Sequence, residues 1–393
     1  MKVRRGHRFK LKPAPEMEHA FVVMAGHARF VGNKALRLSL DRLARGVPIL
    51  WYTDLCGLLH LWKQSEEYGF LAEANAQVLQ QKCKDLCRAF SDAFDPTQPG
   101  KRLPRFKKRG VDDSFRFPQG VRIENRRVYL PKVGWVGFFH SRSVAGTINS
   151  ATVSREADGW YVSIQTEVTL AEPALHPGPP IGVDRGVAVF AATSAGELVA
   201  AINAGKRLAN RMRHLQRLLA RQRKGSKNRA KTKRRIARLH QSIARRRADF
   251  LHKLSTRWSQ SHALIVLEDL RIGNLTRSAK GTVEEPGRHV AAKSGLNRSI
   301  LDQGWGAFAQ MLAYKLTERG GQLLLVPAHH TSQACSGCGR IQAANRLSRD
   351  AFRCVVCGHA EHAEAEVKGA VPAPQPSASM NAAKVILQRR LAA

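Results

Sequence analysis

The chain lacks long apolar runs, and none approaches the roughly 18 consecutive apolar residues that a membrane-spanning helix needs. The opening residues, Met1-Lys2-Val3-Arg4-Arg5, lead into further basic positions, so no apolar signal-peptide core is present. Cysteine is scarce as well, with 7 residues in 393, an odd number that suits a reducing compartment. We therefore expect a protein of the cytoplasm without a membrane segment.

Acidic residues are also few, with 30 Asp and Glu against 65 Lys and Arg, which leaves a net charge of +35. Such a field attracts polyanions, and nucleic acid is the leading candidate. The charge is clustered: residues 101–109 place six cations around Phe106, and residues 206–253 contain 19 Lys and Arg with a single acid. The residues predicted to contact nucleic acid are Lys101, Arg102, Arg105, Lys107, Lys108, Arg109, Arg217, Arg221, Lys233, Arg234 and Arg235.

Changes in periodicity predict an α/β plus β chain made of several parts. Short alternating segments predict a small β-barrel or sandwich, which a helical block interrupts after its first strand. After a Pro-rich linker, strands alternate with helices, as in α/β folds. The predicted parts are a first barrel strand (1–15), a helical insert (16–98), the rest of the barrel (99–172), an α/β core (173–330) with a basic helical hairpin (206–253), a zinc segment (331–360) and a final segment (361–393) with a C-terminal helix.

Four of the cysteines form two CxxC pairs with 15 residues between them. The pairs are Cys335 with Cys338 and Cys354 with Cys357. This spacing is typical of zinc ribbons, in which four thiolates surround Zn²⁺ as a closed tetrahedron. We therefore predict a structural zinc ion, with no open position for a substrate.

Two acidic residues end apolar segments that read as strands. Asp184 follows Ile181-Gly-Val, and Glu268 follows Ala263-Leu-Ile-Val-Leu. Adjacent strand ends in an α/β sheet can bring such carboxylates together. Three acids of this kind bind two Mg²⁺ ions and activate water for phosphodiester cleavage.

Together these segments resemble the TnpB family, RNA-guided nucleases of insertion sequences that are related to type V CRISPR effectors. The resemblance spans nearly the whole chain. It rests on Arg8-Phe-Lys-Leu-Lys-Pro-Ala-Pro-Glu, Leu103-Pro-Arg-Phe-Lys-Lys-Arg, Ser114-Phe-Arg-Phe-Pro-Gln, Gly182-Val-Asp-Arg-Gly, Val266-Leu-Glu-Asp-Leu-Arg-Ile-Gly-Asn-Leu, Thr331-Ser-Gln-Ala-Cys-Ser-Gly-Cys-Gly, Phe352-Arg-Cys-Val-Val-Cys-Gly-His and Asn381-Ala-Ala-Lys.

The resemblance implies a wedge-like β-barrel, a helical recognition domain and an RNase H-like RuvC domain with an inserted zinc ribbon. It also implies a guide RNA, a double-stranded DNA target and Mg²⁺-dependent cutting, in a prokaryotic protein that acts in the cytoplasm at the nucleoid. The motifs leave the oligomeric state open.

The third RuvC motif departs from the family, which carries an Asp two residues before Asn-Ala-Ala. That position is Ser379 here, which could only cap the helix that follows. His362-Ala363-Glu364 resembles the expected His-Ala-Asp, so Glu364 is the candidate third acid and Glu366 its alternative. Two readings stay open, an active DNA endonuclease and a nuclease-dead RNA-guided DNA binder that represses transcription. A DNA-strand transferase is disfavoured, because no Tyr or Ser nucleophile has a supporting context.

Overall fold

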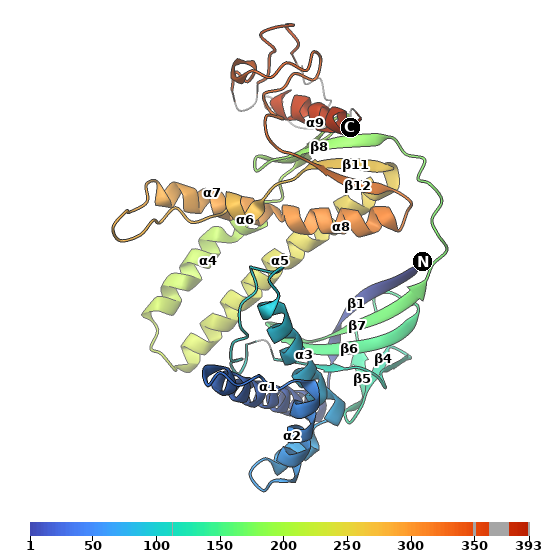
Figure 1. Cartoon of the computed structure of the whole chain (residues 1–393), viewed down its shortest axis with the longest axis vertical. Helices are drawn as coiled ribbons and strands as arrows, with labels where there is room; N and C mark the ends of the chain where they lie inside the picture. Colours follow the sequence, from blue (N-terminus) through green and yellow to red (C-terminus); the bar gives the residue numbers. More distant parts are fainter. Residues whose placement is uncertain (112, 349–350, 361–376, 392–393) are drawn as a thin grey trace. The chain divides into compact units, whose positions relative to one another are not determined.

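The computed structural model describes all of the chain except residues 112, 349–350, 361–376 and 392–393. The chain forms two compact units, Met1–Ala171 and Glu172–Ala393 (Figure 1). None of the described helices combines the length and the apolar character that crossing a membrane requires.

The first unit contains a seven-stranded antiparallel sheet of order β2-β6-β7-β1-β5-β4-β3. Its strands are β1 (Lys2–Lys12), β2 (Ser114–Phe117), β3 (Arg122–Glu124), β4 (Arg127–Leu130), β5 (Gly134–Phe138), β6 (Thr147–Glu156) and β7 (Gly159–Thr169). Phe115 of β2 and Val128 of β4 belong to one buried core, so the sheet curls around it. In the described residues the edge strands β2 and β3 do not pair with each other, so hydrogen bonds do not close the predicted barrel.

Helices between β1 and β2 form the rest of the first unit. They are α1 (Pro15–Ala44), α2 (Tyr52–Gln64), the short 3₁₀ helix η1 (Gly69–Glu73) and α3 (Ala76–Phe94). Pro15 opens α1, where a missing backbone N–H costs nothing. The first half of α1 packs on the sheet through Phe21 and Met24. Its second half joins α2 and α3 in a separate core around Leu55 and Phe90.

The second unit is built on a five-stranded mixed sheet of order β10-β9-β8-β11-β12. Its strands are β8 (Pro180–Arg185), β9 (Val189–Thr193), β10 (Leu198–Ala200), β11 (Leu264–Glu268) and β12 (Gln322–Val326). The first three strands run antiparallel, whereas β8, β11 and β12 are parallel. Parallel strands are covered on both faces, which explains the continuous apolar run of β11. The mixed α and β composition predicted from the sequence is confirmed.

Helices cover both faces of this sheet (Figure 1). The helices of this unit are α4 (Ala204–Arg221), α5 (Lys227–Ser261), α6 (Ile272–Leu275), α7 (Val290–Gln303), α8 (Trp305–Thr317), the 3₁₀ helix η2 (Ala343–Asn345) and α9 (Ser377–Leu391), and among them α5, α8 and α9 lie against the sheet. On one face, Trp258 of α5 and Phe308 of α8 pack over Ile181 and Ile265. On the other face, Ile386 of α9 packs on Val266. The sheet is thus the middle layer of three.

Candidate functional site

Asp184 and Glu268 lie at the carboxyl ends of two adjacent parallel strands. The pairing of β8 with β11 ends at Val183 and Leu267, so the next residue of each strand is one of these acids. Neighbouring strands lie about 4.8 Å apart, which puts the two backbones close together. Because side chains alternate along a strand and Val183 enters the core with α5 and α8, both acids face α9. The structure therefore brings together the two acids that the sequence singled out.

Helix α9 covers this pair and carries the Asn-Ala-Ala motif. It approaches β8 so closely that a Cβ on Gly182 would lie 2.1 Å from the carbonyl oxygen of Ala383. The same approach brings the side chain of Ser379 into a hydrogen bond with Asp184. The prediction that Ser379 caps the helix is wrong, because α9 begins at Ser377 and Ser379 lies within its first turn.

Both carboxyl groups have a raised pKa. Burial raises the pKa of Glu268 to about 7, and the nearby Asp184 carboxylate adds to the rise, against a hydrogen bond from the Thr331 hydroxyl. Burial also raises the pKa of Asp184, against the hydrogen bond with Ser379 and the charges of Arg346 and Arg185. A divalent cation between two such groups would offset the cost of burying their charges and the repulsion between them, so the pair is suited to hold Mg²⁺.

Arg185 ties the two acid-bearing strands together. Its guanidinium donates a hydrogen bond to the backbone carbonyl of Glu268, and burial lowers its pKa to about 10. The carboxylates of Glu268 and Asp184 oppose that fall in pKa. Arg185 therefore holds the strand ends in place, and its positive charge partly offsets theirs.

The predicted third acid, Glu364, and its alternative, Glu366, lie outside the described residues. Within the part of the chain that is described, the one group of three or more His, Cys, Asp or Glu side chains suited to a metal ion is the cysteine cluster. The described carboxylate site thus consists of Asp184 and Glu268, with the Ser379 hydroxyl beside them.

The four cysteines converge as the spacing predicts. The sulfur atoms of Cys335, Cys338, Cys354 and Cys357 all lie within 4.8 Å of one another. The Sγ atoms of Cys335 and Cys357 are 3.6 Å apart, as are those of Cys338 and Cys354. Zn–S bonds of 2.3 Å in a tetrahedron separate the sulfurs by about 3.8 Å. All four thiols are free, so the cluster fits a closed structural zinc site.

Both cysteine pairs form the same backbone turn. The N–H of Cys335 donates to the carbonyl of Arg340 at 3.0 Å, and the N–H of Cys354 donates to that of His359 at 2.8 Å. The glycine after each pair has a left-handed φ, which only glycine adopts without strain, at Gly339 (+73°) and Gly358 (+72°). In each turn a backbone N–H points at the first sulfur, from Gly337 to Cys335 at 3.3 Å and from Cys357 to Cys354 at 3.5 Å, and such contacts favour thiolates.

The basic segment 101–109 contains neither helix nor strand and is largely exposed, and Asn33 of α1 binds its backbone. The Asn33 side chain donates to the carbonyl of Lys107 at 3.0 Å and accepts from its N–H at 2.9 Å. This pair of bonds fixes the backbone without using a cation. Phe106 is 48% exposed, so its ring is available to stack on a base. The cations of this segment, all exposed, are Lys101, Arg102, Arg105, Lys107, Lys108 and Arg109.

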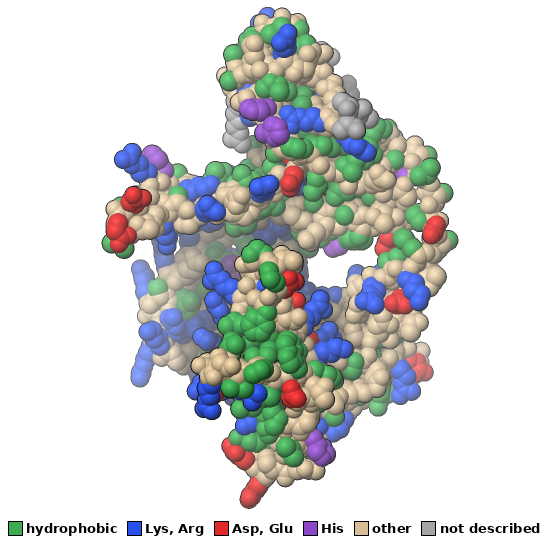
Figure 2. Space-filling model, in the orientation of Figure 1, with side chains coloured by type: hydrophobic (Ala, Val, Ile, Leu, Met, Phe, Trp, Pro, Cys, Tyr) green, Lys and Arg blue, Asp and Glu red, His purple; other side chains and the backbone are tan. Residues whose placement is uncertain are grey.

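Helices α4 and α5 form the basic hairpin. Leu215 and Leu239 are buried along its apolar stripe, while Lys and Arg side chains crowd its surface (Figure 2). At the turn, Arg229 of α5 donates to the carbonyl of Gln222 at 3.0 Å. The cations singled out from the sequence in this hairpin are all exposed: Arg217, Arg221, Lys233, Arg234 and Arg235.

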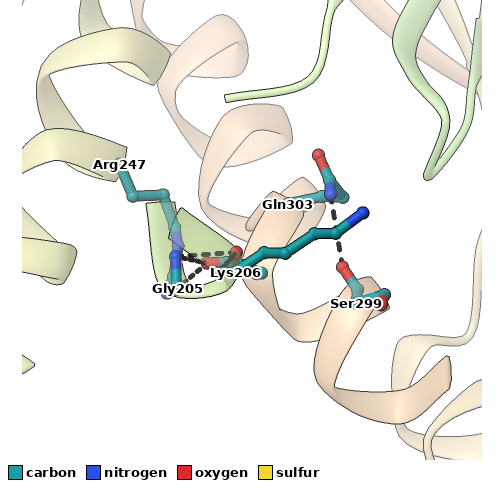
Figure 3. A network of polar contacts seen from close by, with 6 residues as sticks. Gly205, Lys206, Arg247, Ser299 and Gln303 are labelled. Atoms are coloured by element: carbon teal, nitrogen blue, oxygen red, sulfur yellow. Dashed lines mark hydrogen bonds and ion pairs between the residues drawn. The ribbon is translucent and has the colours of Figure 1, made fainter. Parts of the chain in front are cut away.

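The buried Asp302 anchors the base of the hairpin through Gly205, Lys206 and Arg247, which Figure 3 labels. Asp302 of α7 accepts from the N–H groups of Gly205 and Lys206, at 2.8 and 3.3 Å, where α4 begins. It also pairs with Arg247 of α5 at 2.8 Å. An acid at a helix N-terminus is favourable, so one side chain fixes both helices.

Several residues of these sites were not assigned a role from the sequence, among them Thr331, Asn345 and Asp302. Asn345 is fully buried in the cysteine segment, where it donates to Gln333 and accepts from Val355. Isolated polar residues in loops and helices carry no periodic signal. Thr331 begins one of the motifs that resemble the TnpB family. Its place in that motif was the only indication in the sequence of its contact with Glu268.

Three protein-family models match separate parts of the chain. A family model described as "Probable transposase" (OrfB_IS605) matches residues 162–279. Two further models, described as "Cas12f1-like, TNB domain" and "Helix-turn-helix domain" (HTH_OrfB_IS605), match residues 305–370 and 1–46.

Two relatives cover most of the chain. It is 44% identical over 372 residues to "Putative RNA-guided DNA endonuclease InsQ" of Escherichia coli (strain K12), which covers 94% of this chain and 91% of that protein. It is 29% identical over 350 residues to "Putative RNA-guided DNA endonuclease" of Streptomyces pristinaespiralis, covering 86% and 82%. The protein chain in "Cryo-EM structure of the Cas12f1-sgRNA-target DNA complex" has a similar fold, with a TM-score of 0.56, 15% identity and coverage of 95% and 83%.

Proposed function

The chain belongs to the OrfB_IS605 family, the TnpB-type proteins of insertion sequences, and on that premise we propose that it is an RNA-guided DNA endonuclease. A guide RNA and a double-stranded DNA target are its partners, in the cytoplasm at the prokaryotic nucleoid. The observation that carries the proposal is the pair of buried acids, Asp184 and Glu268, at adjacent strand ends of a strongly basic protein.

In this proposal base pairing with the guide chooses the target, and the protein binds the backbones. Segment 101–109 and the α4–α5 hairpin supply exposed cations for phosphates. The anchored base of the hairpin keeps the cations of the hairpin in a fixed array, which reduces the entropy lost on binding. The RNase H-like second unit positions the scissile strand against the acids.

In the proposed cleavage site Asp184, Glu268 and Glu364 would hold Mg²⁺. When bound, Mg²⁺ lowers the pKa of water and neutralises charge on the phosphate. Arg185 fixes the spacing of the strand ends, and Thr331 orients the Glu268 carboxylate. Glu364 has one methylene more than the Asp it replaces, which lengthens the side chain by roughly 1.5 Å, and the insertion 365–379 separates it in the sequence from Asn381-Ala-Ala.

A second function, guided binding without cutting, is favoured by Ser379. This residue stands where the family carries its third Asp, and its side chain contacts Asp184. A serine hydroxyl is a weak ligand without the negative charge of a carboxylate. If Ser379 alone fills the third position, the protein blocks its target as a repressor and leaves both strands intact.

One experiment separates these functions. The wild type and three variants, Asp184→Asn, Glu364→Gln and Ser379→Asp, are loaded with the same guide RNA and given Mg²⁺ and a matched duplex. Binding is read by filter retention and cutting by gel. If the wild type cuts and both Asp184→Asn and Glu364→Gln stop cutting while still binding, the endonuclease is supported with Glu364 as third acid.

Binding by every protein, with cutting by Ser379→Asp alone, supports the repressor instead. Cutting that survives Glu364→Gln removes Glu364 from the site, and Glu366→Gln is then tested in the same way. If the matched duplex is not retained better than a scrambled one, the RNA-guided function itself is wrong.

A further inference from the structure

Asn381 of α9 is fully buried, and its side chain contacts the cysteine segment. Its Nδ2 donates to the carbonyl of Ala334 at 2.7 Å, and its Oδ1 accepts from the N–H of Ser336 at 2.9 Å. These two residues flank Cys335, the first cysteine of the cluster. One amide therefore fixes the backbone on both sides of a zinc ligand.

The same side of α9 makes further contacts with the cysteine segment. Ala378 lies in a small buried core with Cys335 and Cys354. Two turns after Asn381, the Gln388 side chain donates to the carbonyl of Ser336 at 2.8 Å. Positions 378, 381 and 388 share one helix face, since they are separated by three and seven residues.

The other side of α9 meets the sheet. Ala383 lies against Gly182, Ile386 packs on Val266 and Val326, and Ser379 contacts Asp184. Helix α9 thus touches the cysteine cluster on one face and the acid-bearing strand on the other. A displacement of its cluster-facing side must move Ser379 relative to Asp184, because a helix of 15 residues shifts as a unit.

We propose that Asn381 is a positioning residue that transmits zinc occupancy of the cysteine cluster to the Asp184 strand. With zinc bound, the turn around Cys335 is fixed, and its carbonyl and N–H groups hold the Asn381 amide. Without zinc the four cysteines lose their common centre, the turn loosens, and α9 loses its register on β8. The inference is independent of the proposed function, because zinc and α9 can be followed without nucleic acid.

Two consequences can be measured on the full-length protein. Hydrogen exchange of the α9 amides 382–388 should speed up when a chelator removes zinc from the wild type. In Asn381→Ala, exchange in α9 should be roughly 30-fold faster with zinc present, the factor for about 2 kcal/mol from two neutral hydrogen bonds. Removing zinc from this variant should then increase the exchange rate of α9 little further.

Linkage adds a reciprocal requirement. If zinc favours the docked helix through Asn381, the docked helix favours zinc by the same factor. Competition with a chelator of known affinity should therefore show a roughly 30-fold weaker zinc affinity for Asn381→Ala, at an unchanged stoichiometry of one zinc per chain. Gln388→Ala removes a single hydrogen bond from the same helix face to Ser336 and buries no charge, so it should fall between the two and serves if the alanine variant folds poorly.

The matched control is Ile386→Ala on the sheet-facing side of the same helix. It weakens α9 packing but leaves the Asn381 amide in place, so removal of zinc should still accelerate α9 exchange. The proposal is overturned if zinc removal accelerates α9 in Asn381→Ala as much as in the wild type. It is equally overturned if zinc affinity is the same in both proteins.

Discussion

Replacing Gly182 by alanine tests the close packing of α9 on the acid-bearing strand. The added Cβ would lie 2.1 Å from the Ala383 carbonyl oxygen and 2.8 Å from the Leu387 backbone nitrogen. Both are backbone atoms of a helix, so no side-chain rotation removes the clash, and α9 must move by about 1 Å. Overpacking of this kind costs about 1–3 kcal/mol. For the second unit this predicts a melting temperature lower by roughly 2–12 °C.

The control for this prediction is Gly295→Ala. Gly295 lies inside α7, and a Cβ there meets no atom within 4 Å. Alanine is favoured over glycine in a helix by about 0.5–1 kcal/mol, so this variant should melt slightly higher. Calorimetry of the full chain with zinc present measures the melting temperatures of both variants. The transition of the second unit is identified as the one that a zinc chelator shifts. Equal melting of Gly182→Ala and wild type would show that α9 does not pack on β8 as described.

Three further variants test the carboxylates, the zinc cluster and the basic hairpin. The pKa of Glu268 is raised to about 7, so the folded state binds the proton of this carboxyl group more tightly than the unfolded state does. The free energy of unfolding gains from this proton fully below pH 4.5 and loses the gain as the pH rises through 7. In the absence of Mg²⁺, Glu268→Gln should thus have a higher melting temperature than the wild type at pH 8, and the difference should narrow by pH 5.5. A difference that does not change with pH would contradict this. Cys354→Ser should lower zinc content and the second unit's melting temperature, because structural zinc contributes folding energy, whereas unchanged values would exclude the four-cysteine site. Neutralising Arg234 and Arg235 together should reduce the salt slope of RNA binding by about 1–2 units, with Arg37→Gln, an exposed cation paired with an acid, as the unaffected control.

Much of the second unit was predictable because its chemistry is local in sequence. β11 is a continuous apolar run that ends in Glu268, as buried parallel strands do, and Asp184 follows the apolar part of β8 as its penultimate residue. The four cysteines were predictable from spacing alone, since a tetrahedral ion demands two tight turns.

The contacts that connect these parts were not predictable. Ser379 was expected outside the helix, but α9 starts two residues earlier, and its contact with Asp184 depends on how closely α9 packs on Gly182. Asn381 stood in a recognised motif, yet its partners Ala334 and Ser336 are more than 40 residues away. Such polar contacts follow from tertiary packing, which sequence periodicity and secondary-structure propensity do not report.

The central claim is that the protein recognises DNA through an RNA that it carries. The direct measurement is retention of two unrelated DNA duplexes by the same protein loaded in turn with two guide RNAs that share the constant part and differ in the pairing segment. Each guide should cause retention of its own matched duplex, and exchanging the guides should exchange the duplexes. Retention of both duplexes to the same extent with either guide would contradict it.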